Sequence, residues 1–365
     1  MRMESHPELK QKSSLSNSDI MFLIAAVIFV CMYGFALLFY PESFLKFQTF
    51  FDLFNLNAPL FIMTLGLSIV MIGGGIDISV GAVCGLVTMC CAVLLESGNG
   101  NILGALLLAL GIGLAFGLLQ GYLIAFLEIQ PFIITLAGLF LANGLLTTIH
   151  KDPINVTRPE LVSLRDFKII IPWLGSHNRL GIFIPCEIKP GTLIVVVLVV
   201  FLFIVMQWSR FGRNVYAIGG NSQSANMLGV NVRKTKFYTY LLCGLLSGIS
   251  GFVFLMTTGA GNVGNAAGFE MKAIASSIIG GILLNGGVGN IIGAPIGVLT
   301  LLIINELIRA AGVQSNFQTI VSGLLLYIFI VLQSVVLYIR SRSKLSPLLP
   351  VWLRFPVLQG RNKSQ

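Results

Sequence analysis

The sequence predicts an all-α membrane protein, a polytopic bundle of about ten transmembrane helices. Composition is the first reason, because 56% of the 365 residues are hydrophobic and only 10% are charged, against ~25% charged residues in soluble domains. The second reason is that charged residues divide the chain into uncharged intervals that suit membrane helices of ~20 residues. Ten such spans leave no room for a large soluble domain, so a fused ATPase is excluded.

The uncharged intervals locate the expected spans. They are 20–41, 53–76, 78–95, 97–127, 129–150, 190–209, 237–269, 273–305 and 310–339. The interval 273–305 is too long for one helix, and the turn-rich run from Asn285 to Asn290 divides it in two, which gives the tenth span. The half from Ala273 to Leu284 is short, and it fits a re-entrant or tilted half-helix unless residues 269–272 extend it.

Basic residues predict the orientation of the chain, since Lys and Arg gather in cytoplasmic loops. Segment 209–236 carries several basic residues and no acid, which places it in the cytoplasm. We therefore expect a cytoplasmic N-terminal segment (1–19), a transmembrane domain (20–339) with an external loop (150–191), and a basic cytoplasmic tail (340–365). The net charge of +9 then has a membrane explanation, and no nucleic-acid partner is expected.

Several kinds of chemistry are not expected in this chain. No GxxxxGK[ST] phosphate loop is present, so ATP is not bound by that route. His6, His150 and His177 all lie in polar loops, which leaves no Ser-His-Asp set. The six cysteines lack the paired spacing of a metal site. We expect no catalytic residues, no metal and no cofactor in this chain.

Two hydrophilic segments are candidate contact surfaces. The external loop 150–191 is punctuated by prolines, and its length suggests a docking surface. Segment 209–236 contains a helix-like core from Ser222 to Leu228, entered through Gly219, Gly220 and Asn221. Asn221 or Ser222 is expected to cap this helix.

Polar positions within the spans are candidate pathway residues. Asp77 follows a run of three glycines and is either an intramembrane carboxylate or a helix-capping side chain. Thr135 and Asn143 lie eight residues apart, near one face of the fifth span. Asn305 and Glu306 lie in the ninth, and an ion pair with Arg309, three residues later on the same face, is the alternative interpretation of Glu306. Uncharged hydrogen-bonding groups suit a hydroxylated ligand such as a sugar, although the same side chains also serve helix packing.

Three strings of the sequence are distinctive: GGGIDISVG at 73–81, FGRNVYAIGGNSQSANMLGV at 211–230 and AIASSIIGGILLNGGVGNIIGAPIGV at 273–298. Together with PFIITLAG at 131–138, they resemble the membrane permease subunits of ribose-class sugar ABC importers over about residues 55–335. The chain looks closest to galactofuranose-type permeases. One departure is Lys272, which stands where the family commonly has an acid.

The resemblance implies a pore subunit of the bacterial inner membrane that passes a pentose or galactofuranose-like sugar. It implies three partners: a cytoplasmic ATPase subunit that binds ATP, a second permease copy or sister permease, and an external sugar-binding protein. Carried over, the ATPase coupling element comprises Gly212, Gly219, Gly220, Asn221 and Gly229, with Ser222 to Leu228 as its docking helix. A positive φ is expected at Gly220. A secondary transporter or channel that works without an ATPase is the alternative.

Overall fold

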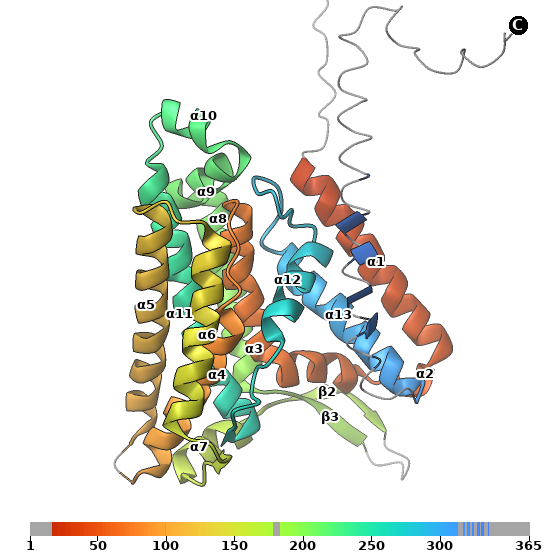
Figure 1. Cartoon of the computed structure of the whole chain (residues 1–365). Helices are drawn as coiled ribbons and strands as arrows, with labels where there is room; N and C mark the ends of the chain where they lie inside the picture. Colours follow the sequence, from red (N-terminus) through yellow and green to blue (C-terminus); the bar gives the residue numbers. More distant parts are fainter. Residues whose placement is uncertain are drawn as a thin grey trace, which may run out of the picture.

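The computed structural model describes residues 17–98, 100–177 and 183–312, and single positions between 317 and 335. These residues form a bundle of helices, with two short helices at one end and a β-hairpin at the other (Figure 1). Residues 1–16 of the expected N-terminal segment, most of the interval 310–339 and the tail 340–365 lie outside the described residues.

Seven of the described helices are long and apolar enough to cross a membrane. They are α1 (Asn17–Phe39), α3 (Phe47–Ile72), α5 (Ile102–Ala125), α6 (Pro131–Ile149), α8 (Pro190–Trp208), α11 (Val232–Thr258) and α13 (Gly293–Ala310). The apolar helix α4 (Val80–Glu96) has 17 residues, and α2 (Pro41–Phe44) is a single turn. The helical membrane class is confirmed, but the number of ten spans is not.

The predicted half-helix is present as α12 (Phe269–Ile279), which has 11 residues. Residues 269–272 form its first turn, and an irregular connection, 280–292, leads into α13. Gly280 and Gly293 lie against each other at the two ends of this connection. The interval 273–305 is therefore divided as predicted.

Helices α3 and α11 form the centre of the bundle, whereas α1, α5, α6 and α8 present apolar side chains outward. Glycines bring α5 and α11 into backbone contact, because a Cβ on Gly113 would overlap the carbonyl oxygen of Gly244, and one on Gly244 would overlap that of Gly113. Small residues allow this close approach between membrane helices.

Helix α3 is broken near its middle. Asn57 has non-helical backbone angles (φ −115°, ψ 16°), and Pro59 follows inside the helix. Proline lacks the N–H of the helical hydrogen bond, and its ring clashes with the preceding turn. The first half of α3 consequently runs across the bundle beside β2, while the second half follows the bundle's long direction (Figure 1).

Loop 150–191 contains strands that an all-α prediction did not include. β2 (Ile169–His177) pairs antiparallel with β3 (Phe183–Ile188), and β1 (Ile154–Asn155) pairs with β4 (Ala260–Gly261). A short helix, α7 (Pro159–Asp166), separates β1 from β2. Isoleucine-rich runs in β2 and β3 explain the hairpin, since β-branched residues favour strands. Loop 150–191 is therefore an ordered surface in its described residues.

Asn55 attaches the hairpin to the bundle. Its side-chain amide donates to the carbonyl of Glu187 at 2.8 Å, and its oxygen accepts from the hydroxyl of Thr192 at 2.7 Å. The Asn55 side chain is buried, so these bonds satisfy a polar group that would otherwise be costly to bury. The bonds connect the first half of α3 with β3 and the start of α8.

Candidate functional site

Segment 209–236, the expected coupling segment, forms two short helices rather than one before α11 begins. α9 (Arg210–Gly220) precedes α10 (Ser222–Met227), and only the second was predicted. The Ser209 hydroxyl caps α9 by accepting from the backbone N–H of Gly212 at 3.1 Å. A Cβ on Gly212 would overlap the carbonyl of Met206, so glycine permits the tight turn from α8 into α9.

Of the two predicted capping residues, Asn221 and Ser222, Asn221 is the N-cap of α10. Its side-chain oxygen accepts from the backbone N–H of Ser224 at 2.8 Å. The helix ends at Met227, and Gly229 follows with a positive φ of 83°. Asn221 and Gly229 therefore fix the start and the end of α10.

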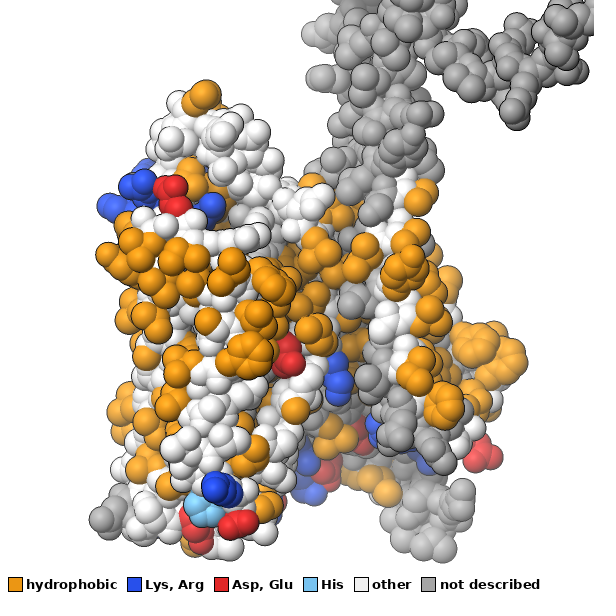
Figure 2. Space-filling view, in the orientation of Figure 1, with side chains coloured by type: hydrophobic (Ala, Val, Ile, Leu, Met, Phe, Trp, Pro, Cys, Tyr) orange, Lys and Arg blue, Asp and Glu red, His pale blue; other side chains and the backbone are white. Residues whose placement is uncertain are grey.

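The tip of α10 exposes two large apolar side chains. Met227 is 88% and Leu228 84% exposed. This tip projects beyond the rest of the bundle (Figure 1) and carries hydrophobic surface at its extremity (Figure 2). Methionine and leucine on a projecting helix suit a protein contact, because an apolar side chain gains free energy when a partner covers it.

Three glycine-containing segments meet beneath α10 and α9. The backbone N–H of Gly287 donates to the carbonyl of Ile72 at 2.8 Å. A Cβ on Gly219 would overlap that carbonyl and lie 2.5 Å from the Gly287 nitrogen, and one on Gly286 would lie 2.6 Å from the Cα of Gly74. We call this contact of residues 72–74, 219–220 and 286–287 the glycine junction. It joins α9 to the end of α3 and to the α12–α13 connection through backbone atoms alone.

The expected positive φ at Gly220 is wrong. Gly220 is the last residue of α9, it is not among the positive-φ glycines, and a Cβ there would meet no atom within 4 Å. The restricted position is Gly219. The sequence could not separate two adjacent glycines, because the difference comes from the tertiary contact with Ile72 and Gly287.

Tyr216 adds a side-chain bond from α9 to the same connection. Its hydroxyl donates to the carbonyl of Gly289 at 3.0 Å. Burial raises the pKa of Tyr216 to about 12, so the hydroxyl keeps its proton near neutral pH. The N–H of Gly289 in turn donates to the hydroxyl of Ser18 at 3.3 Å, which places the start of α1 at this end of the bundle.

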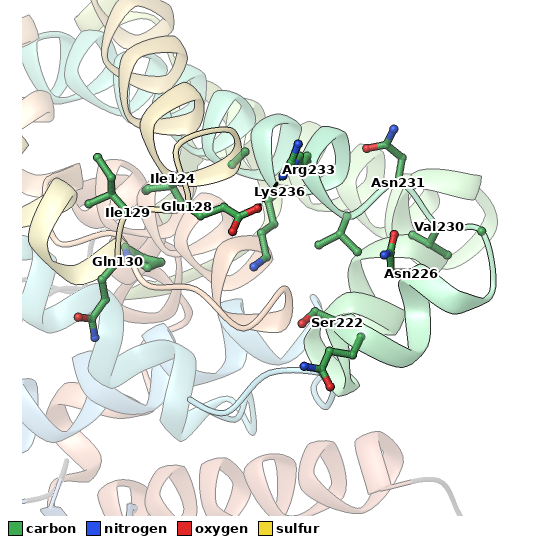
Figure 3. Close-up of a pocket in the computed structure, with 15 residues that line it drawn as sticks. Ile124, Glu128, Ile129, Gln130, Ser222, Asn226, Val230, Asn231, Arg233 and Lys236 are labelled. Carbon is green, nitrogen blue, oxygen red and sulfur yellow. Dashed lines mark hydrogen bonds and ion pairs between the residues drawn. The ribbon is translucent and has the colours of Figure 1, made fainter.

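An open cavity of ≈760 Å³ lies between the α5–α6 turn and the α10–α11 turn (Figure 3). Glu128 and Arg233 form an ion pair at its wall, 2.9 Å apart, and Lys236 lies between Glu128 and Ser222. Glu128 adopts a positive φ of 56°, which orients the α5–α6 turn. Polar and charged side chains therefore line the side of α10 that faces the α5–α6 turn.

Asp77 forms a local side-chain turn just before α4, whose N-cap residue is Ser79. Its carboxylate accepts from the backbone N–H of Ser79 at 2.9 Å and from the Ser79 hydroxyl at 2.7 Å, immediately before α4. The amide of Gln120 donates to the same hydroxyl at 2.8 Å. Asp77 is only 2% exposed. A part in the pathway remains a prediction for this residue.

Thr135 and Asn143 do not share an environment. Thr135 is fully buried, and its hydroxyl donates to the carbonyl of Phe132 at 3.4 Å, whereas Asn143 is exposed. Eight residues rotate a helix by about 80° beyond two full turns, which is enough to separate their surroundings in α6. Their proposed contact with a ligand stays a prediction.

Asn305 lines a second cavity, of ≈280 Å³, at the end of the bundle that carries the hairpin. This cavity lies between α3, α12 and α13, and we call it the α3–α12–α13 pocket. Its walls include the apolar residues Leu53, Leu56, Leu60, Phe269 and Leu302, and its polar residues are Thr49, Asp52, Asn57, Lys272, Asn305, Glu306 and Arg309.

Of the charged residues in this pocket, the sequence made only Glu306 a pathway candidate; Asp52, Lys272 and Arg309 were not assigned to the pathway. Glu306 pairs with Arg309 at 3.1 Å, as the spacing suggested. Lys272 lies over the ring of Phe269, with 5.0 Å from its ammonium to the ring centroid. Asp52 accepts from the amide of Gln48 at 2.6 Å. In the sequence, the only indication of a special role for Lys272 is that it stands where the family commonly has an acid.

Comparison with known proteins identifies the family. A family model described as "Branched-chain amino acid transport system / permease component" matches residues 49–330. The chain belongs to this permease family. Family membership and the seven apolar helices make it a multi-pass inner-membrane protein.

The similarity to named relatives covers most of the chain. The fructose import permease protein FruG of Bifidobacterium longum is 33% identical over 92% of this chain and 96% of its own length. The Escherichia coli inner membrane ABC transporter permease protein YjfF is 36% identical over 89% of this chain and 95% of its own length. The Escherichia coli ribose import permease protein RbsC is 30% identical over 80% of this chain and 87% of its own length.

These relatives confirm the resemblance to ribose-class permeases, while the galactofuranose-type assignment stays a prediction. No solved structure matched the chain.

Proposed function

We propose that this chain is the permease subunit of an ATP-driven sugar importer, and that α10 is the dock for a separate ATPase subunit. The observation that carries the proposal is the projecting tip of α10, with Met227 and Leu228 exposed. A dock must be stiff to transmit force, and α10 is capped at its start by Asn221 and supported through α9 by the glycine junction.

The orientation follows from the basic residues around the dock. Arg210, Arg213, Arg233, Lys234 and Lys236 lie in or beside α9 and the start of α11, and basic loops favour the cytoplasmic side. The start of α1 lies at the same end, through Ser18, so the N-terminus is cytoplasmic in this proposal. The β2–β3 hairpin then faces outward, where an external sugar-binding protein would dock.

The substrate class rests on the relatives, two of which are named for fructose and ribose import. A neutral monosaccharide is therefore the proposed cargo, with a second permease, either a copy or a sister chain, completing the pathway. ATP is bound by the partner ATPase and not by this chain.

The dock can be tested by changing its tip. Leu228→Asp places a charge on the surface that the ATPase would cover, and it should abolish co-purification with the ATPase subunit. Asn231→Asp is the matched control, because it adds the same charge at the same end and keeps an oxygen to cap α11, where Asn231 accepts from Lys234.

Co-purification that survives Leu228→Asp would contradict the assignment of α10. Sugar uptake by the chain alone in proteoliposomes, driven by an ion gradient, would contradict the ATP-driven mechanism and support a secondary transporter.

A further inference from the structure

We propose that the α3–α12–α13 pocket is a binding site for a neutral monosaccharide during its passage, with Lys272 and Asp52 among the side chains that contact it. The proposal rests on the proposed function, because it names where the sugar is held within the permease. Four observations support the proposal: two of the helices around the pocket are interrupted beside it, and the lining, the charge balance and the size of the pocket suit a neutral sugar.

Two of the three helices that form the sides of the pocket, α3 and α12, are interrupted there. α3 breaks at Asn57, which lines the pocket. α12 begins at Phe269, after Gly268 in the left-handed conformation, and it is only a half-helix. In transporters, discontinuous helices gather at substrate sites, because interrupted backbone is tolerated in a membrane where it lines a cavity.

The lining has the composition of a small-molecule site. Leucines from α3 and α13 form an apolar wall, and a few polar side chains converge on it, which is the usual pattern of ligand pockets. Phe269 adds an aromatic ring, and Lys272 lies over that ring with its ammonium 5.0 Å from the centroid. Aliphatic and aromatic surfaces suit the C–H groups of a sugar, while the polar groups suit its hydroxyls.

Charge balance selects a neutral ligand. The pocket contains two acids, Asp52 and Glu306, and two bases, Lys272 and Arg309, so its formal charge is zero. An anionic sugar would need an excess of positive charge to offset the loss of its hydration. Sugar hydroxyls, in contrast, both donate and accept, and they can bond to ammonium and carboxylate groups alike.

Size and polarity agree with a monosaccharide. The volume of ≈280 Å³ lies just below the range of ~300–1,000 Å³ typical for drug-sized ligands, which favours one sugar ring over an oligosaccharide. Figure 2 shows acidic and basic side chains in the hollowed lower part of the bundle, between the α6 side and the α1 side.

The test uses the assembled importer in proteoliposomes with its external binding protein, its ATPase and internal ATP. The probes are radiolabelled D-ribose, D-fructose and D-galactose, with D-galacturonate as the anionic comparison. Lys272→Met removes the charge and keeps an unbranched side chain over Phe269, and Asp52→Asn removes the opposite charge. Lys151→Met is the control, since Lys151 is exposed in the loop that follows α6 and lies outside the pocket.

We expect both pocket variants to lower the maximal uptake rate of the transported neutral sugar about tenfold, the effect of losing one hydrogen bond to a charged group. The half-saturating sugar concentration, set by the binding protein, should not change, and neither should ATPase co-purification. Lys151→Met should transport like the unaltered chain. Should Lys272→Met fail to assemble, Lys272→Gln replaces it, because its amide also donates a hydrogen bond, and partial retention of uptake is expected.

Full uptake in both Lys272→Met and Asp52→Asn would overturn the pocket assignment while leaving the importer proposal intact. Preferred uptake of D-galacturonate by the unaltered importer would overturn the neutral class. Failure of the unaltered chain to co-purify with an ATPase would instead contradict the proposed function itself.

Discussion

Replacing Gly219 by alanine tests whether the glycine junction holds the helix pair to the bundle. The added Cβ would overlap the carbonyl oxygen of Ile72 and lie 2.5 Å from the nitrogen of Gly287, whereas Cβ contacts are normally no closer than 3.0 Å. The Gly287 nitrogen must therefore move by at least 0.5 Å, the difference between these distances, and the Ile72 carbonyl by more. Both neighbours are backbone, so no side chain can rotate away.

The expected cost has two parts. Overpacking costs ~1–3 kcal/mol, and disruption of the 2.8 Å hydrogen bond between Ile72 and Gly287 leaves polar groups unpaired at ~1–3 kcal/mol. A total of about 2–6 kcal/mol should lower the melting temperature of the purified chain by roughly 3–8 °C, because a chain of this length has an unfolding entropy of ~0.8 kcal/mol/K. Thermal unfolding in detergent, followed by tryptophan fluorescence, measures this shift.

Gly220→Ala is the matched control. No atom lies within 4 Å of the added Cβ, and alanine favours a helix over glycine by ~0.8–1.0 kcal/mol, so the melting temperature should stay constant or rise. Equal melting temperatures for the two variants would refute the tight backbone packing at the junction. If Gly219→Ala were destabilised but kept full ATP-dependent uptake, the junction would contribute to stability only.

Three further predictions concern Gly113, Asn221 and Arg233. Gly113→Val should destabilise the chain by about 3 kcal/mol through overpacking against α11, whereas Gly111→Val, which meets no atom within 4 Å in the same helix, should be tolerated, and thermal unfolding compares them. Asn221→Ala should cost ~0.5–2 kcal/mol of α10 stability and lower ATPase co-purification. Asn221→Asp keeps an oxygen that can cap the helix, so α10 stability and ATPase co-purification should be unchanged. Arg233→Ala should change stability by less than about 1 kcal/mol, because both partners of its ion pair are more than 60% exposed; a melting-temperature loss as large as that expected for Gly219→Ala would contradict this.

The sequence predicted elements whose cause is local. Asn221 caps α10 because an Asn side chain directly before a helix can bond its first turn, and residue order had narrowed the cap to Asn221 or Ser222. The division of 273–305 was also predictable, since a Gly- and Asn-rich run disfavours continuous helix. Loop 150–191 was recognised as irregular from its prolines, although the pairing of β2 with β3 depends on a contact across the loop.

The sequence did not predict features that arise from contacts between distant segments. Gly219 and Gly220 are the same residue type at adjacent positions, yet a Cβ added at Gly219 would overlap Ile72 and Gly287, whereas one added at Gly220 would meet no atom within 4 Å. Thr135 and Asn143 were grouped by spacing, but the packing of α6 buries only Thr135. The α3–α12–α13 pocket likewise combines residues near 52, 272 and 306, and no local pattern brings them together.

The α12–α13 segment connects the two ends of the permease. Its two helices provide Lys272 and Asn305 to the pocket, and its connection provides Gly287 to the glycine junction. Because Gly219 contacts Gly287 through backbone atoms, a displacement of α9 must either break the hydrogen bond between Gly287 and Ile72 or move the connection with it. The connection is covalently continuous with α12 and α13, which form two sides of the pocket. Closure of an ATPase at the proposed α10 dock would therefore have a short mechanical route to the proposed sugar site, and that route passes through the glycine junction.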